Sequence, residues 1–258
     1  MNEWAKKTLE VVRTENYLDR LQRIYPNIEN PPRTINDEIK LLIKIAFDGR
    51  NGESLLNILL DLKKFPYKDS YVAFLRKDRG AIDRNPETTS RICNKLYRMG
   101  FEKIIKGITK PKETNTQRGP QFRNWTKERF RWVDVDAFRA SSKGIVLLQA
   151  SEKIARDFCN QEMGIGISKR PDMVAKSNAC YVIGEAKFLS SGGGNQGRSF
   201  DDGMALATNN QGSAFKVFLL DGIHWIDTGS DQYRRIEYST AAVFSALLLE
   251  EFLESICQ

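Results

Sequence analysis

The chain lacks the residues that build several familiar catalytic sites. Its 258 residues include one histidine, His224, and four cysteines. Zinc sites with several histidines, HNH-type nuclease sites and histidine-rich phosphodiesterase sites cannot be assembled from one histidine. No two cysteines form a CxxC pair, and their spacing fits neither a zinc ribbon nor a dense disulfide framework, so we expect reduced, mostly buried thiols. The motif GxSxG and a P-loop motif are also missing, which excludes a nucleophile elbow and a P-loop.

Long apolar runs are missing as well. No segment approaches the roughly 20 consecutive apolar residues that span a bilayer. The first seven residues lack the hydrophobic region of a signal peptide. We therefore expect no membrane association and a cytoplasmic location. Hydrophobic residues make up 41% of the chain, which is enough for one sizeable core and a second small one.

Basic residues outnumber acidic ones by 40 to 33, which gives a formal net charge of +7 and a pI of about 9.2. The segment Arg98–Arg131 holds ten basic and three acidic residues, and the rest of the chain holds 30 of each. A concentrated basic segment in an otherwise balanced chain indicates a polyanionic partner such as nucleic acid. The alternative is a solvent-exposed helix face followed by a loop.

The apolar pattern predicts three regions. Residues 1–109 are predicted to be mainly helical, residues 110–140 to form a basic loop and linker, and residues 141–258 to form an α/β domain. In the first region we predict helices within 1–30, over Ile39–Phe47, over Ser54–Lys64, and from Pro86 to Gly100. Residues 110–120 are polar and predict a loop, whereas Trp125–Phe138 fits either a helix or a strand.

The last region alternates between helical and extended patterns. We predict a helix over Ile145–Met163, a hairpin over Asp172–Phe188, a helix over Phe200–Asn209, strands over Ala214–Leu220 and Ile223–Ile226, and a closing helix over Ser239–Ile256. This order indicates an α/β core.

The hairpin carries the side chains with the clearest chemistry. If Ser177-Asn178 forms its turn, the numbers of paired residues add up to 355, and Asp172 lies opposite Ile183. Side chains alternate along a strand, so Glu185 and Lys187 lie on the same face as Asp172. Diagonal neighbours on paired strands are about 7–8 Å apart, close enough for two carboxylates to hold one divalent cation. Two carboxylates that bind Mg²⁺ beside an ammonium group provide what metal-assisted phosphodiester hydrolysis needs.

These residues resemble the active-site motif of the PD-(D/E)XK nuclease superfamily. Pro171-Asp172 corresponds to its PD, and Glu185-Ala186-Lys187 to its acid-x-lysine segment. The alternative is a surface hairpin with an unrelated Glu-Lys pair. The resemblance implies a nuclease-like α/β core, in which helices flank a mixed central sheet. It also implies Asp172, Glu185 and Lys187 as catalytic residues and Asp172 and Glu185 as Mg²⁺ ligands. Members of the superfamily often carry another acidic residue on the preceding helix, for which Glu152 is our choice and Glu162 the alternative.

Two further segments are similar to type II restriction endonucleases. One is Glu185-Ala186-Lys187-Phe188-Leu189 followed by Gly192 to Gln196, and the other runs from Pro111-Lys112-Glu113-Thr114-Asn115 through to Trp125. The resemblance implies Mg²⁺-dependent cleavage of double-stranded DNA at a short sequence, usually by a homodimer. It also implies a cognate DNA methyltransferase as a genomic partner. The helices of residues 1–109 would then contribute to DNA grip or dimer contacts.

Base and phosphate contacts are expected from polar side chains near these segments. Arginine pairs with guanine, and asparagine or glutamine with adenine, in the major groove. The candidates are Lys110, Lys112, Asn115, Gln117, Arg118, Gln121, Arg123, Lys169, Arg170, Asn195, Gln196 and Arg198. Two other functions stay open, namely a nuclease of the same superfamily directed at DNA structure or damage, and a DNA-binding protein without catalysis. His224 is expected to be structural, although Asp221 lies nearby in the sequence.

Overall fold

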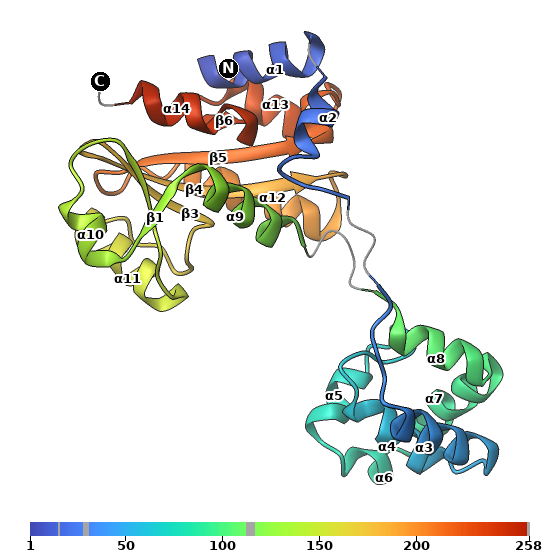
Figure 1. The fold of residues 1–258 in the computed structure, drawn as a ribbon. Coiled ribbons are helices and arrows are strands. Elements are labelled where there is room, and N and C mark those ends of the chain that lie inside the picture. Colours follow the sequence, from blue (N-terminus) through green and yellow to red (C-terminus); the bar gives the residue numbers. More distant parts are fainter. Residues whose placement is uncertain (15, 28–30, 112–116, 257–258) are drawn as a thin grey trace. The chain divides into compact units, whose positions relative to one another are not determined.

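The chain folds into two compact units. The computed structural model describes all 258 residues except 15, 28–30, 112–116 and 257–258. An α/β unit consists of residues 1–28 and 113–258, and a helical unit consists of residues 29–112 (Figure 1). No helix in the described part of the chain is long and apolar enough to cross a membrane.

The α/β unit is built on a six-stranded mixed sheet, which confirms the predicted α/β core with a mixed central sheet. The strands lie in sequence order: β1 (Arg131–Val133), β2 (Ile145–Leu148), β3 (Met173–Ser177), β4 (Cys180–Leu189), β5 (Phe215–Gly222) and β6 (Ala242–Phe244). β3 is antiparallel to both β2 and β4, whereas the β1–β2, β4–β5 and β5–β6 pairs are parallel. The parallel pair β4–β5 therefore needs a crossover, which contains α12 (Gly194–Ala207).

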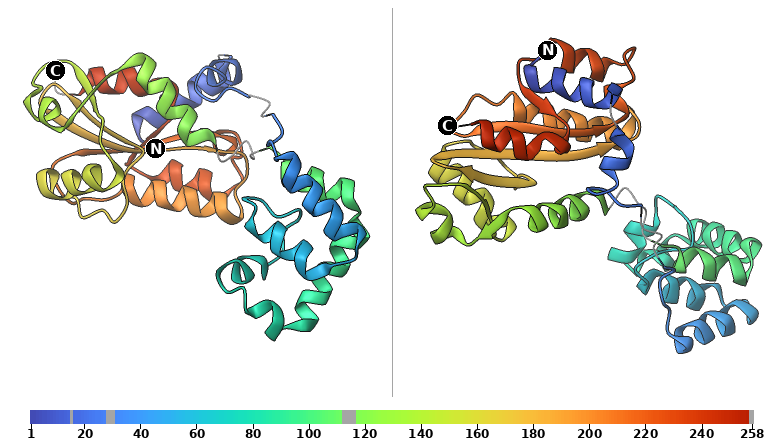
Figure 2. Two further views of the ribbon diagram at one scale, coloured as in Figure 1. Left: turned by 60° about the horizontal axis from the view of Figure 1, so that its bottom comes forward. Right: turned by 45° about the horizontal axis from the view of Figure 1, so that its top comes forward.

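Helices flank this sheet (Figure 1, Figure 2). They are α1 (Glu3–Thr14), α2 (Tyr17–Leu21), α9 (Arg118–Arg129), α10 (Val135–Ala140), α11 (Glu152–Met163), α13 (Asp231–Tyr238) and α14 (Leu249–Ser255), with 3₁₀ turns η2 (Ile223–Trp225) and η3 (Ala246–Leu248). The Trp4 ring of α1 lies 5.6 Å from the ring of Phe244 in β6 and 5.3 Å from that of Phe252 in α14. These aromatic contacts join the two ends of the chain in one core.

The helical unit has a core of its own. It consists of α3 (Asp37–Asp48), α4 (Gly52–Asp61), α5 (Val72–Lys77), α6 (Ala81–Arg84), α7 (Pro86–Met99) and α8 (Phe101–Thr109). Its buried cluster runs from Ile43 to Ile108 and shares no member with the two clusters of the α/β unit. The predicted helix from Pro86 to Gly100 is confirmed, and Gly100 ends it with a φ of 81°.

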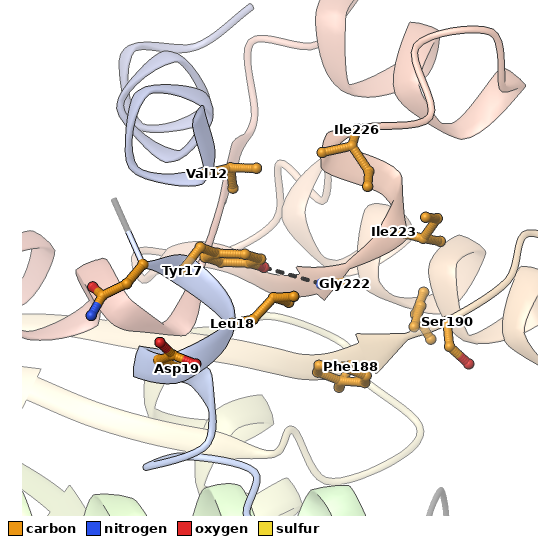
Figure 3. A pocket seen from close by; sticks show the side chains of 11 residues that line it. Val12, Tyr17, Leu18, Asp19, Phe188, Ser190, Gly222, Ile223 and Ile226 are labelled. Atoms are coloured by element: carbon orange, nitrogen blue, oxygen red, sulfur yellow. Dashed lines mark hydrogen bonds between the residues drawn. The ribbon is translucent and has the colours of Figure 1, made fainter. Parts of the chain in front are cut away.

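The boundary between the units differs from the predicted division at residues 109 and 140. The N-terminal helices belong to the α/β unit because buried hydrogen bonds attach them to its sheet. The hydroxyl of Tyr17 donates to Asp221 over 3.0 Å. It also accepts from the Gly222 backbone amide over 3.1 Å (Figure 3). The backbone amide of Ser245 donates to the hydroxyl of Thr8 over 3.0 Å. Such partners lie more than 200 residues away, so no local sequence pattern indicates them.

The predicted hairpin is confirmed, but its register is shifted. Met173 pairs with Gly184 and Ser177 with Cys180, so paired numbers add up to 357 and the turn is Asn178-Ala179. Asn178 adopts a left-handed φ of 51°, which asparagine tolerates better than most residues. Its side chain accepts a hydrogen bond from the Gly144 amide. Continuing this register by one residue puts Asp172 opposite Glu185, closer than the predicted diagonal arrangement.

Several element predictions in the α/β unit were wrong in part. Ile145–Leu148 is a buried strand, and only the second half of the predicted Ile145–Met163 helix is helical. The predicted closing helix is divided into β6, η3 and α14, and the predicted strand at Ile223–Ile226 is a 3₁₀ turn. Helix α9 already begins at Arg118, inside the predicted loop. Cys180 is in a disulfide bond, which the sequence spacing did not indicate, whereas Cys93 and Cys159 are free and buried.

Candidate active site

Asp172, Glu185 and Lys187 meet at one position on the sheet. Asp172 immediately precedes β3, and the other two residues lie in the second half of β4. β3 is buried throughout and β4 is buried from Val182 to Ala186, as expected in the centre of a sheet that is covered on both faces. The two-residue side-chain period then points the two carboxylates and the amine to the same side.

The lysine lies between the two carboxylates. Its Nζ is 2.6 Å from Oδ2 of Asp172 and 2.6 Å from Oε2 of Glu185. The backbone amide of Ala186 also donates to Oδ2 of Asp172, over 3.0 Å. The Glu185 side chain is only 4% exposed, whereas those of Asp172 and Lys187 are 32% and 23% exposed. The cluster is therefore anchored in the core at Glu185 and open to solvent at Asp172.

The three groups shift one another's pKa values. Burial and the charge of Asp172 raise the pKa of Glu185 above its usual value. Burial opposes ionisation of Asp172 too, but the charge of Lys187 and its hydrogen bonds lower the pKa of Asp172 overall. Burial by itself lowers the pKa of Lys187, yet the charges of Asp172 and Glu185 raise it overall. Lys187 is therefore an ammonium group, suited to donate hydrogen bonds and not to accept a proton.

A second lysine contacts the buried carboxylate from the other side. Lys169 Nζ lies 3.4 Å from Oε1 of Glu185 and 2.9 Å from Oδ2 of Asp202, which is carried by α12. These residues line a cavity of about 230 Å³ between the segment before β3 and α12. Lys169 was predicted to contact DNA, whereas Asp202 was not predicted, because only the packing of α12 brings that carboxylate to the site.

Glu152 faces the open side of the cluster. A cavity of about 450 Å³ is lined by Glu152, Asp172, Arg170 and Arg123, together with other residues of α9. Glu152 is exposed and is the first residue of α11, not an interior one. The alternative, Glu162, lies at the far end of the same helix and pairs with Arg139 over 2.9 Å. The structure thus brings Glu152 to the cavity of Asp172 and directs Glu162 elsewhere.

The basic residues predicted to bind DNA fall into separate groups. Arg123, Arg170 and Lys169 line the two cavities beside the carboxylates. Asn195 and Arg198 are exposed in the first turns of α12, which begins at Gly194. Lys110 lies at the end of α8 in the helical unit, and Lys112 and Asn115 lie outside the described residues.

Other residues that were predicted to contact DNA make their contacts within the protein. Arg118 donates to the carbonyl of Tyr25 over 2.8 Å and stacks 4.6 Å from the Phe188 ring centroid. Gln121 donates to the carbonyl of Pro26 over 2.7 Å. Gln196 accepts from the backbone amides of Ser190 and Ser191. Gln117 precedes α9 and is partly buried.

A larger cavity lies apart from this chemistry. It has a volume of about 580 Å³ and is lined mainly by apolar groups of α1, α2, the end of β4 and η2 (Figure 3). None of the predicted site residues lines it. His224 is fully buried against the ring of Phe200, at 5.4 Å between ring centroids, which is consistent with the predicted structural role.

Comparison with known proteins identifies the family. The model of the Tsp45I type II restriction enzyme family matches residues 2–256. No curated protein and no solved structure matches the chain. A match over nearly the whole sequence covers both units, including the carboxylate–lysine cluster. The chain therefore belongs to the Tsp45I type II restriction enzyme family, and its activity is that of a site-specific deoxyribonuclease that binds DNA.

Proposed function

We propose that this protein cleaves double-stranded DNA at a short specific sequence in a Mg²⁺-dependent reaction, with a PD-(D/E)XK-like site formed by Asp172, Glu185 and Lys187. The observation that carries the proposal is the convergence of two carboxylate oxygens on one cationic atom, each 2.6 Å from Lys187 Nζ. Glu185 lies in β4, and Asp172 immediately precedes β3, the strand paired with β4, so the register of this pair preorganises the site.

The donor set suits a hard divalent cation. Asp172 and Glu185 offer oxygen ligands of the kind that Mg²⁺ prefers, and their oxygens already surround a positive charge. In the described part of the chain no group of three or more Asp, Glu, His or Cys side chains could hold a metal. Two carboxylates are enough for Mg²⁺, which usually keeps several waters and needs only one or two. Bound there, it would polarise the scissile phosphate and lower the pKa of a water.

The protein's own residues have separable roles in this proposal. The Ala186 amide orients Asp172, and Lys169 neutralises part of the charge on Glu185. Lys187 stays protonated and donates to the attacking water or to the phosphate oxygens, where it stabilises developing negative charge. Glu152, across the 450 Å³ cavity, is proposed to orient water on the open side of Asp172.

Base and phosphate contacts beside this site are assigned to the residues that stay available. Arg123 and Arg170 line the cavity, and Asn195 and Arg198 are exposed at the start of α12. Arginine and asparagine are the residue types that pair with guanine and adenine edges.

Two partners follow from the proposed reaction. The described residues form one carboxylate–lysine cluster, whereas a duplex has two strands to cut, so we propose a homodimer that presents two clusters. Sedimentation of the protein with and without DNA tests this, and a monomer on cleaved DNA would contradict it.

A cognate DNA methyltransferase is proposed because the host sequence needs protection from cleavage. The family match favours this function over the structure-directed nuclease and the non-catalytic DNA-binding protein.

A cleavage assay with unmethylated DNA tests the site. Purified protein with Mg²⁺ should give discrete fragments, and EDTA should abolish them. Asp172→Asn keeps an acceptor for the Ala186 amide but removes the charge, and it should lower the cleavage rate at least about a hundredfold. The matched control is Asp136→Asn on α10, whose side chain is 94% exposed and which should cleave normally. Retained activity in Asp172→Asn would reject the site, and random cutting would reject sequence specificity.

A further inference from the structure

The net charge of the chain is confined to the helical unit. Residues 29–112 contain 18 basic and 11 acidic residues, a formal charge of +7, whereas the α/β unit contains 22 of each. The basic segment Arg98–Arg131, which the sequence analysis singled out, extends across the boundary between the units. The helical unit, which does not contain the carboxylate–lysine cluster, therefore has the net positive charge that attracts polyanions.

Many charges of the helical unit neutralise one another. Asp48, Asp61, Asp69 and Asp78 each pair with a basic side chain, namely Lys44, Arg79, Arg91 and Arg84. The excess charge therefore lies on the remaining basic residues, and their positions decide where a polyanion would bind.

Three of these residues form a stripe on α8. Lys103, Lys106 and Lys110 follow one another at intervals of three and four residues, so they share a face, and all three are exposed. The buried residues Ile104 and Ile108 occupy the opposite face. The stripe is about 10 Å long, roughly the axial length of three base pairs. One acidic residue of the helix, Glu102, flanks it.

Three more basic residues adjoin this helix. Gly107 lies against Pro66, since a Cβ added there would meet the Pro66 carbonyl at 2.3 Å, and this contact brings Lys63 and Lys64 to α8. The Arg33 amide donates to the Thr109 carbonyl over 2.7 Å. A cavity of about 430 Å³ at this place is lined by Arg33, Lys63, Lys64 and Ile108, and none of its lining residues is acidic. Arg33 Nε is buried there and has no hydrogen-bond partner within the described residues.

We propose that these six residues, Arg33, Lys63, Lys64, Lys103, Lys106 and Lys110, form the α8 surface that binds the sugar–phosphate backbone of duplex DNA. The proposal rests on the proposed function for its partner, but not for the residues that cleave. Lysines dominate the surface, and lysine contacts phosphate as a point charge without reading bases. None of the exposed large hydrophobic residues belongs to it, whereas single-stranded nucleic acid is usually held by aromatic stacking. The surface supplies affinity, and the α/β unit supplies cleavage.

The salt dependence of binding tests the α8 surface in the full-length protein. A labelled short duplex is titrated in EDTA at several salt concentrations, so that no cleavage occurs. The variant Lys63→Gln/Lys103→Gln/Lys106→Gln should bind at least about tenfold more weakly, and its slope of log K against log salt should be shallower by about 2.7, at about 0.9 per lost phosphate contact. The control Lys6→Gln/Lys77→Gln/Lys143→Gln has the same net charge and alters three exposed lysines elsewhere. It should keep the wild-type slope.

The outcomes separate this proposal from the cleavage site. Equal slopes and affinities for the two triple variants would overturn the α8 surface and leave the catalytic assignment intact. Stronger binding to a single strand of the same length than to the duplex would also overturn it. Asp172→Asn should bind with the wild-type slope in EDTA. If Asp172→Asn still cleaves while the first triple variant loses affinity, the catalytic assignment fails and the α8 surface stands.

Discussion

At the scale of single residues, Asp221 is a fully buried carboxylate that joins three parts of the α/β unit. It accepts from the hydroxyls of Ser245 over 2.6 Å and Tyr17 over 3.0 Å, and from the Ala246 amide over 3.3 Å. Burial raises its pKa to about 6 despite these hydrogen bonds. The carboxyl group of Asp221 therefore binds its proton more tightly in the folded state than in the unfolded chain.

This shift predicts how stability depends on pH. Below about pH 4 Asp221 is protonated in both states, and between about pH 4 and 6 only the unfolded chain loses the proton. Its contribution to the free energy of unfolding is thus complete below pH 4 and is lost by about pH 6, a change of about 3 kcal/mol. Asp221→Asn cannot titrate, so it should lose less stability than wild type between pH 4 and 7.

Urea unfolding followed by tryptophan fluorescence measures the free energy of unfolding of the α/β unit at each pH, because all four tryptophans lie in this unit. Asp136→Asn, which removes an exposed carboxylate, is the control. Identical pH profiles for Asp221→Asn and wild type would show that Asp221 is not the titrating group.

Strand parity was enough to predict that the three proposed catalytic residues share one face of the hairpin. The turn was placed one residue early, which moved the register by two, but a shift of two leaves every side chain on its original face. Asp172, Glu185 and Lys187 therefore came together as predicted. Asp202 could not be found in this way, because it reaches Lys169 only through the packing of α12.

At the scale of elements, α12 lies unusually close to β5. A Cβ added to Gly203 would meet the ring of Phe218 at 2.3 Å. Phe218 pairs in register with Glu185, so this contact sets the distance between the helix and the strand that carries the site. The same helix carries Asp202, which pairs with Lys169 beside Glu185.

Gly203→Ala should therefore affect both stability and activity. We expect a loss of about 1–3 kcal/mol, since the aromatic ring cannot move without disturbing the core. Cleavage should fall more than folding explains, because α12 would move away from Glu185. The rate is measured at a temperature where circular dichroism shows the variant to be folded. Gly229→Ala, where an added Cβ meets nothing within 4 Å, is the control. A variant as stable and active as this control would contradict the close packing.

Two of the wrong element predictions in the α/β unit share one cause. Ile145–Leu148 is a four-residue apolar run, and such a run fits a buried strand and a buried helix equally well by periodicity. Ala242–Phe244 is similar, since its three residues are too few to show the alternation of a strand. Sheet pairing decides both cases, and pairing partners are distant in the sequence. The helix from Pro86 and the hairpin, whose signals are local, were predicted, although the register of the hairpin was shifted by two residues.

At the scale of the whole molecule, the helical unit is an insertion in the α/β unit. The chain leaves the α/β unit after residue 28 and returns at residue 113. The Arg33 amide and the Thr109 carbonyl are hydrogen-bonded over 2.7 Å, so the two ends of the insertion lie side by side. No local sequence pattern indicates this insertion, because the helices before and after the boundary have similar sequence patterns. Only long-range contacts such as Tyr17–Asp221 distinguish them.

Because these ends are adjacent, the insertion should be removable. Replacing residues 34–108 by a short Gly-Ser linker deletes every residue of the buried cluster in the helical unit. It deletes no residue of the two buried clusters in the α/β unit. We expect the α/β unit to fold, with a fluorescence-detected Tm within a few degrees of wild type, because domains with separate cores fold independently. Duplex affinity should fall together with the lost charge of the helical unit, and Mg²⁺ binding measured by calorimetry should persist. An unfolded deletion protein would show that the two units form one cooperative structure.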